Sequence, residues 1–171
     1  MEWRCTRDDG EAVGEMDAVV FHPRYGVVVL EIKAGNVVIR DGVWFYASRR
    51  PMKMSPFSQA RRNRYALTER LQQGLGRAVI DTLTITHGAW FPDVNWIGPL
   101  PGIEAPSRAF LLDRTSLENA EEALERLLLA ANPQPIAWTQ AQQQTLKALL
   151  APDCHLLVPC LLYTSDAADD T

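Results

Sequence analysis

Cysteine, long apolar runs and a secretion signal are scarce or missing in this chain of 171 residues. Its three cysteines, Cys5, Cys154 and Cys160, are odd in number and form no CxxC pair. This argues against a disulfide framework and a zinc site, and favours reduced thiols in a cytoplasmic protein. No apolar run approaches the length of a membrane span. The charged start, MEWRCTRDDGE, lacks the apolar centre of a signal peptide, so we expect a cytoplasmic protein without a membrane partner.

Basic residues are also scarce, but only in the second half of the chain. Residues 78–171 carry 4 Lys and Arg against 12 Asp and Glu, whereas residues 1–77 carry 13 against 9. The first half could therefore face a polyanion, although the net charge of the whole chain is −4.

Short β-prone runs fill the first fifty residues. The run MDAVVFHP predicts a strand that ends at Pro23, and VVVLEIK predicts a strand buried on both faces, with the turn PRYG between them. Asp41-Gly42 lies between two further β-prone runs and favours a two-residue hairpin turn.

Helical periodicity begins after Ser55. Ser55 is the expected cap of a helix that ends at Gly74 or Gly76. Its expected apolar positions include Phe57, Ala60, Tyr65, Leu67 and Leu71. Strands are expected near residues 82–91 and in RAFLLD. A helix capped by Thr115 or Ser116 should follow, and then a second helix in TQAQQQTLKALLA, capped by its first threonine. This order of elements predicts an α/β fold.

Charged residues interrupt the first two predicted strands, where apolar residues are expected. If these strands pair antiparallel, Asp17, Glu31 and Lys33 meet in one patch, because side chains two apart point the same way. Two carboxylates and the Ile32 carbonyl would suit Mg²⁺ or Mn²⁺, and Lys33 could orient or help deprotonate a water or neutralise a phosphate. The alternative is a salt-bridge cluster on an edge hairpin.

The spacing Asp-x13-Glu-x-Lys resembles the active-site pattern of the PD-(D/E)xK nucleases. The blocks GEMDAVVFHPRYGVVVLEIKAGNV, DGVWFY and SPFSQARRNRYAL together resemble the nuclease-related domain family over about residues 13–115. The resemblance implies a restriction-endonuclease-like core, a mixed central β-sheet flanked by helices. It also implies that Asp17 and Glu31 hold the metal and that Lys33 is catalytic.

The same resemblance assigns two further residues. Gln59 matches a polar helix residue that positions metal-bound water or substrate, and Glu15 is a possible accessory acid. The superfamily usually has a helix before the first strand, and here that helix is expected to be missing.

A basic stretch follows the hairpin and is expected to contact nucleic-acid phosphates. Its residues are Arg49, Arg50, Lys53, Arg61, Arg62 and Arg64. The alternative is an ordinary solvated helix face. Trp44, Phe45 and Tyr46 could stack on bases, but an aromatic strand is more often part of the core.

The C-terminal segment AWTQAQQQTLKALLAPDCHLLVP is similar to the entry to superfamily-one DNA helicases, with Gln142 or Gln143 as the adenine-reading residue. The phosphate loop that should follow is missing, so ATP binding is not expected. We therefore expect a nuclease-related domain over residues 1–130, a linker and the start of a truncated helicase-like module over 131–160, and a non-native tail over 161–171.

The sequence thus predicts a Mg²⁺-dependent nuclease domain that hydrolyses DNA, linked in its native chain to a helicase module for DNA processing or repair. The first alternative is a catalytically decayed, non-enzymatic DNA-binding module. The second is a small-molecule or signalling domain that uses the same patch and has no affinity for DNA.

Overall fold

A computed structural model describes residues 3–6, 12–100, 105 and 107–150, with side chains described from Met16 onward. The strands are β1 (Trp3–Thr6), β2 (Ala12–Met16), β3 (Ala18–His22), β4 (Gly26–Ile32), β5 (Val37–Arg40), β6 (Val43–Tyr46), β7 (Ile85–Phe91) and β8 (Leu111–Asp113). The helices are α1 (Pro56–Leu75), α2 (Arg77–Ile80), α3 (Ala120–Ala131) and α4 (Gln140–Leu150), with 3₁₀ turns η2 (Arg108–Phe110) and η3 (Arg114–Leu117). Within this part of the chain, none of the helices is both long and apolar enough to cross a membrane.

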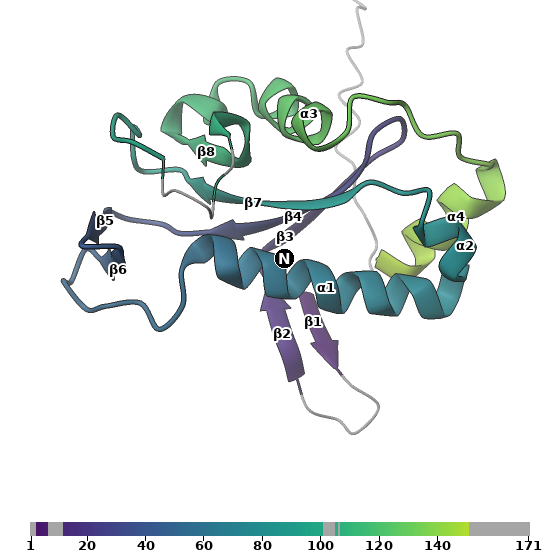
Figure 1. Cartoon of the computed structure of the whole chain (residues 1–171), viewed down its shortest axis with the longest axis horizontal. Helices are drawn as coiled ribbons and strands as arrows, with labels where there is room; N and C mark the ends of the chain where they lie inside the picture. Colours follow the sequence, from purple (N-terminus) through teal and green to yellow (C-terminus); the bar gives the residue numbers. More distant parts are fainter. Residues whose placement is uncertain (1–2, 7–11, 101–104, 106, 151–171) are drawn as a thin grey trace, which may run out of the picture.

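A four-stranded mixed sheet in the order β3-β4-β7-β8 forms the centre of the fold. Strands β3 and β4 pair antiparallel, while β4, β7 and β8 run parallel. Helix α1 covers one face of this sheet and α3 the other (Figure 1). The predicted α/β class, with a mixed sheet flanked by helices, is confirmed and is compatible with a restriction-endonuclease-like core.

Strand β4 is buried on both faces, as its continuous apolar run predicts. Val27 and Val29 pack in a cluster with residues of α1, and Val28 and Leu30 pack with residues of α3. The strand therefore holds the two helical layers together, and each of its residues faces one layer or the other.

Two hairpins flank the central sheet. In the predicted one, Asp41 (φ 49°) and Gly42 (φ 77°) both have positive φ angles, as a two-residue hairpin turn requires, and they join β5 to β6. The β1–β2 hairpin was not predicted, because the mixed charged and apolar residues before Gly14 show no clear alternation.

Helix α1 begins where predicted, because the Ser55 hydroxyl accepts a hydrogen bond from the Ser58 amide at 3.1 Å. It ends at Gly76, one of the two glycines predicted to end it, while Gly74 lies inside the last turn, where a Cβ atom would come within 2.5 Å of the Leu149 side chain of α4. The expected apolar position of Tyr65 is wrong, because Tyr65 lies on the solvent side of the helix and is 57% exposed.

The predicted cap of the helix after β8 is also wrong. Thr115 and Ser116 lie in η3, and α3 begins at Ala120 after Asn119, whose side chain accepts a hydrogen bond from the Glu122 amide at 3.2 Å. The next helix, α4, does have the predicted threonine cap. The Thr139 hydroxyl accepts from the Gln142 amide at 3.2 Å, and the Gln142 side chain accepts from the Thr139 amide at 2.9 Å.

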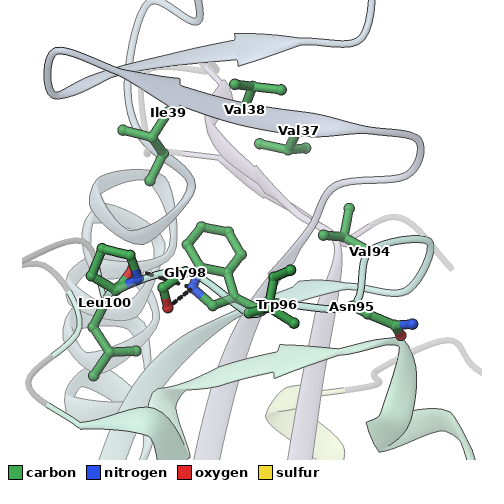
Figure 2. Close-up of a pocket in the computed structure, with 10 residues that line it drawn as sticks. Val37, Val38, Ile39, Val94, Asn95, Trp96, Gly98 and Leu100 are labelled. Carbon is green, nitrogen blue, oxygen red and sulfur yellow. Dashed lines mark hydrogen bonds between the residues drawn. The ribbon is translucent and has the colours of Figure 1, made fainter.

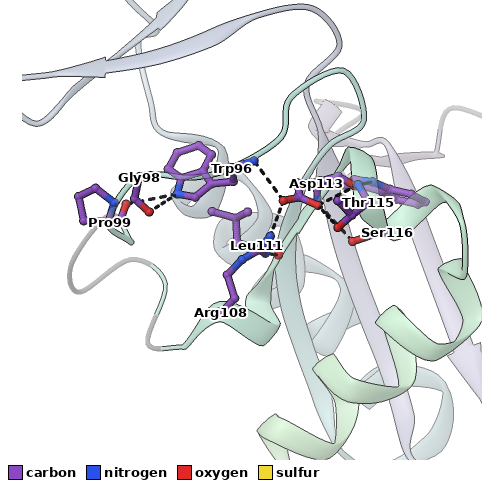
Figure 3. Close-up of polar contacts among 9 residues, drawn as sticks. Trp96, Gly98, Pro99, Arg108, Leu111, Asp113, Thr115 and Ser116 are labelled. Atoms are coloured by element: carbon purple, nitrogen blue, oxygen red, sulfur yellow. Dashed lines mark hydrogen bonds and ion pairs between the residues drawn. The ribbon is translucent and has the colours of Figure 1, made fainter.

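Asp113, at the end of β8, is buried and ties together the segments around it (Figure 3). One of its oxygens accepts hydrogen bonds from the amide and hydroxyl of Thr115 at 3.0 and 2.6 Å. The other accepts from the Trp96 amide at 3.1 Å and forms an ion pair with Arg108. Burial raises the pKa of Asp113, but these bonds and the positive charge of Arg108 outweigh it and hold the pKa below its usual value of 3.8.

We expect Asp113→Asn to lower the free energy of unfolding at pH 7 by about 2–3 kcal/mol, because it weakens hydrogen bonds to a charged acceptor. Because the pKa is lowered, this stabilisation is present above pH 3.8 and is lost as the pH falls below it. The difference in unfolding free energy between Asp113→Asn and wild type should therefore be smaller at pH 3 than at pH 7. Urea unfolding at both pH values measures this. The exposed Asp81→Asn serves as control and should change stability by no more than about 0.5 kcal/mol; an equal effect of the two substitutions would contradict the role of Asp113.

Candidate active site

Asp17, Glu31 and Lys33 lie on the same face of the sheet, the face covered by α1. In the β3–β4 register Ala18 pairs with Leu30, so Asp17 comes opposite Glu31. Glu31 and Lys33 continue the alternation of Val27 and Val29, whose side chains pack towards α1. The antiparallel pairing expected from the sequence is confirmed, and it brings the three charged side chains to one end of the sheet.

Hydrogen bonds join this group to its surroundings. The Ile32 amide donates to Asp17 Oδ2 at 2.7 Å, across the two strands. Lys33 Nζ lies 2.5 Å from Glu31 Oε1 and donates to Gln59 Oε1 at 3.3 Å. Gln59 in turn donates from Nε2 to the Met54 carbonyl at 2.8 Å. Gln59, in the first turn of α1, therefore gives the lysine a second acceptor besides Glu31.

Glu31 is the most buried charged residue of this group, with 4% of its surface exposed. Loss of solvent raises its pKa above the usual 4.5, and the charge of Asp17 raises it further. The hydrogen bond and charge of Lys33, and the charge of Arg62, act in the opposite direction without cancelling the rise. A buried acid whose pKa is raised by the loss of solvent and by a neighbouring charge is typical of a functional site.

The donor atoms at this point fit a hard divalent cation. Asp17 and Glu31 supply carboxylate oxygens, the ligands that Mg²⁺ and Mn²⁺ prefer. Since the amide and carbonyl of one strand residue point to the same edge, the Ile32 carbonyl lies on the side of Asp17, as its amide does. Among the described side chains, no group of three or more His, Cys, Asp and Glu could hold a metal, so a cation here would depend on these two acids and on backbone or solvent oxygens.

The basic residues predicted to contact phosphates are divided between two places. Arg49, Arg50 and Lys53 are exposed in the segment that joins β6 to α1, and Arg61 and Arg62 are exposed on α1 itself. Arg64 is different: it is half-buried, and its guanidinium lies 4.4 Å from the centre of the Tyr65 ring. Glu15 lies in β2, outside the described side chains.

Neither His87 nor Asp93 was predicted from the sequence to belong to the site. His87 on β7 pairs in register with Val29 and so shares the face of Glu31; burial first, then the charges of Arg64 and Arg61, lower its pKa to about 4. Asp93 accepts a hydrogen bond from the Gly35 amide at 2.6 Å and ties the segment after Lys33 to the end of β7. Neither residue belongs to a short motif, so only the register of the strands brings them near the site.

Residues 3–87 match the family model described as the nuclease-related domain. This chain belongs to the nuclease-related domain family. The matched range contains Asp17, Glu31, Lys33 and Gln59 and extends through α1 to His87. Neither the curated proteins nor the solved structures include a match to the chain.

We expect the nuclease-related domain to bind Mn²⁺, and Asp17→Asn and Glu31→Gln each to weaken that binding at least ten-fold, because each removes a charged oxygen ligand. Lys33→Met should bind Mn²⁺ at pH 8 at least as tightly as wild type, because it removes a cation that pairs with Glu31. Below pH 6 the same variant should bind more weakly than wild type, because Glu31 loses a partner that lowers its pKa and protons compete with the metal.

Isothermal titration at the two pH values measures these affinities. Asp41→Asn, at the exposed tip of the β5–β6 hairpin, is the control for a change of charge alone. Wild-type affinity in Asp17→Asn would rule out this acid as a ligand.

Proposed function

We propose that the nuclease-related domain of this protein is a metal-dependent phosphodiesterase that cuts DNA. The observation that carries the proposal is the approach of Lys33 to Glu31, opposite Asp17 and beside Gln59, at the buried end of two paired strands. Its family is one of nuclease-related proteins, whose superfamily is generally dependent on divalent metals.

Asp17, Glu31 and the Ile32 carbonyl would hold Mg²⁺ or Mn²⁺. When bound, such a cation polarises a phosphate oxygen and makes a coordinated water more acidic. Asp17 is oriented for this role by the Ile32 amide, and Glu31 by the surrounding core. The burial that raises the pKa of Glu31 also excludes bulk water, which strengthens electrostatic interactions inside the site.

Lys33 supplies the positive charge on the substrate side. Its ammonium group is held between Glu31 and Gln59, so it is positioned before substrate binds. There it would orient the attacking water and neutralise the negative charge that develops on the phosphate oxygens as the leaving oxygen departs. Gln59 is a positioning residue in this scheme, because it fixes Lys33 through one hydrogen bond and is itself fixed by the Met54 carbonyl.

Nucleic acid would approach over the start of α1 and the segment before it. Arg49, Arg50, Lys53, Arg61 and Arg62 are exposed there, and lysine and arginine contacts to phosphates hold a strand without reading its sequence. Arg62 also acts electrostatically on Glu31, so this basic surface reaches the proposed metal site.

We expect cleavage of linear, circular or single-stranded DNA in the presence of Mg²⁺ or Mn²⁺, and none with EDTA. Lys33→Ala should lower the cleavage rate by about 10²–10³-fold, because it removes a charge that stabilises the transition state. Gln59→Leu should lower it by less, and Gln73→Leu, at an exposed position near the other end of α1, should leave it unchanged. Equal and complete inactivity of wild type and Lys33→Ala with every metal would refute the enzymatic proposal.

The second candidate is a decayed module that binds DNA without cutting it. It is favoured by the pairing of Lys33 with Glu31. This ion pair offsets the negative charge of Glu31, so that the two acids together attract a cation less strongly. DNA binding that is unchanged by EDTA, without cleavage, would support this candidate.

The link to a helicase module and to DNA repair in a native chain also stays a proposal. Gln142, one of the two predicted adenine-reading residues, exchanges hydrogen bonds with Thr139 at the start of α4, which is the arrangement of an ordinary helix cap.

A further inference from the structure

A small pocket lies on the β5–β6 hairpin, next to the proposed active site. It has a volume of about 240 Å³, and its lining includes Asn36, Val38, Arg40, Phe45 and Arg49. It differs from the larger, apolar pocket of about 390 Å³ between β5 and residues 94–100, where Trp96 and Leu100 lie among aliphatic side chains (Figure 2). The smaller pocket is lined by two aromatic residues, Phe45 and Tyr46, and by an amide and two guanidinium side chains.

The hairpin register determines which side chains face this pocket. Val38 pairs with Phe45 and Arg40 with Val43, so these four alternate with Ile39 and Trp44, which pack into the core. Phe45 therefore belongs to the outer face of the hairpin, and it is only partly buried. Of the three aromatic residues in this strand, Trp44 is stacked on Phe91 at 5.6 Å in the core, and Tyr46 packs against the same cluster, so Phe45 is the ring on the outer side.

A tight turn after β6 brings Arg49 to the pocket. The Arg49 amide donates to the Tyr46 carbonyl at 2.8 Å, and the Tyr46 amide donates to the Arg50 carbonyl at 3.0 Å. Arg49 has a φ of 62°, in the left-handed region that glycine occupies without strain and that arginine rarely adopts. Residues in such conformations cluster at active sites and ligand-binding sites.

We propose that this pocket binds one unpaired nucleotide of a single-stranded nucleic acid. The base stacks on Phe45 next to the Asn36 amide, and Arg40 and Arg49 contact the phosphates on either side. The proposal rests on the proposed nuclease function and specifies its substrate as a strand that is unpaired next to the point of cleavage.

The size and composition of the pocket favour an unpaired nucleotide over a duplex. A volume of 240 Å³ is smaller than the sites that hold drug-sized ligands and suits one planar base. Bases in a duplex are covered by their neighbours on both faces, so Phe45 could stack only on a base that has left the duplex. Contacts to phosphates alone would need no ring at this position.

The pocket is also close enough to the proposed active site for both to contact the same nucleic-acid strand. Asn36 follows Lys33 by three residues, which span at most about 10 Å in an extended chain. The hydrogen bond from the Gly35 amide to Asp93 fixes the course of this segment. In Figure 1 the hairpin lies beyond the end of β4, beside the start of α1, where Gln59 contacts Lys33.

The test is the affinity of the protein for a fluorescein-labelled oligothymidine of twelve nucleotides, measured by anisotropy in EDTA so that no cleavage occurs. Phe45→Leu should weaken binding about 5- to 100-fold, the range found when a stacked base loses its aromatic partner. Phe45→Tyr should bind as wild type. Arg49→Gly, which also relieves the positive φ, and Arg40→Gln should each weaken binding and reduce the slope of log affinity against log salt by about 0.7.

Matched controls separate stacking from general effects. Arg77→Gln removes an exposed arginine from α2, which lies far from the hairpin in Figure 1, and should change affinity by less than Arg40→Gln does. Binding of a blunt DNA duplex should be unaffected by Phe45→Leu. An oligouridine of the same length distinguishes DNA from RNA as the preferred strand.

Wild-type affinity of Phe45→Leu for the oligothymidine, or an equal loss for the duplex, would overturn the proposal, as would a wild-type protein that binds no oligothymidine. Failure of the proposed function is seen separately, in the Mn²⁺-dependent hydrolysis of bis(4-nitrophenyl) phosphate. This small diester has no neighbouring nucleotide, so its hydrolysis tests the catalytic proposal without the pocket. If wild type does not hydrolyse it or any DNA, the catalytic proposal fails, while binding in EDTA still decides whether the pocket holds a nucleotide.

Discussion

The register between β3 and β4 is the constraint on which the site depends. Asp17 and Glu31 are separated along the chain by the turn before Gly26, and only the antiparallel pairing of Ala18 with Leu30 puts them opposite each other. A shift of one residue would turn Glu31 and Lys33 towards α3, into an apolar layer that includes Leu127 and Leu128. The apolar residues between the charges therefore do more than fill the core, because they fix the register that assembles the site.

Glu31 shows how this fold balances stability against chemistry. The strand that carries it is buried on both faces, so the acid loses most of its solvation, and Lys33 compensates only in part. Two residues lie near this pair, Gln59 in the first turn of α1 and Asp17 directly before β3, and Asp93 holds the segment that follows Lys33. Elements from distant parts of the chain thus meet at the end of β4.

Local patterns in the sequence predicted most of the elements that surround this site, and the spacing of Asp17, Glu31 and Lys33 predicted that these side chains lie near one another. The continuous apolar run of β4, the Asp41-Gly42 turn and the Ser55 cap each depend on neighbouring residues, so they could be recognised without a structure. The β1–β2 hairpin, the start of α3 after Asn119 and the exposure of Tyr65 depend on which surfaces the rest of the fold covers. The roles of Asp93 and His87 likewise follow from strand order, which brings β7 next to β4 although more than fifty residues separate them.

The burial of Glu31 also bears on how such a domain changes in evolution. A chain that replaced this acid, together with Lys33, by apolar residues would lose the proposed metal site and at the same time extend the core already formed by Val27 and Val29. Replacement of a buried ion pair by apolar residues of similar volume is often neutral or stabilising, whereas the reverse change has to bury charges again. Persistence of the acid–lysine pair in a lineage would then be a record of purifying selection, because folding alone gives no reason to keep it.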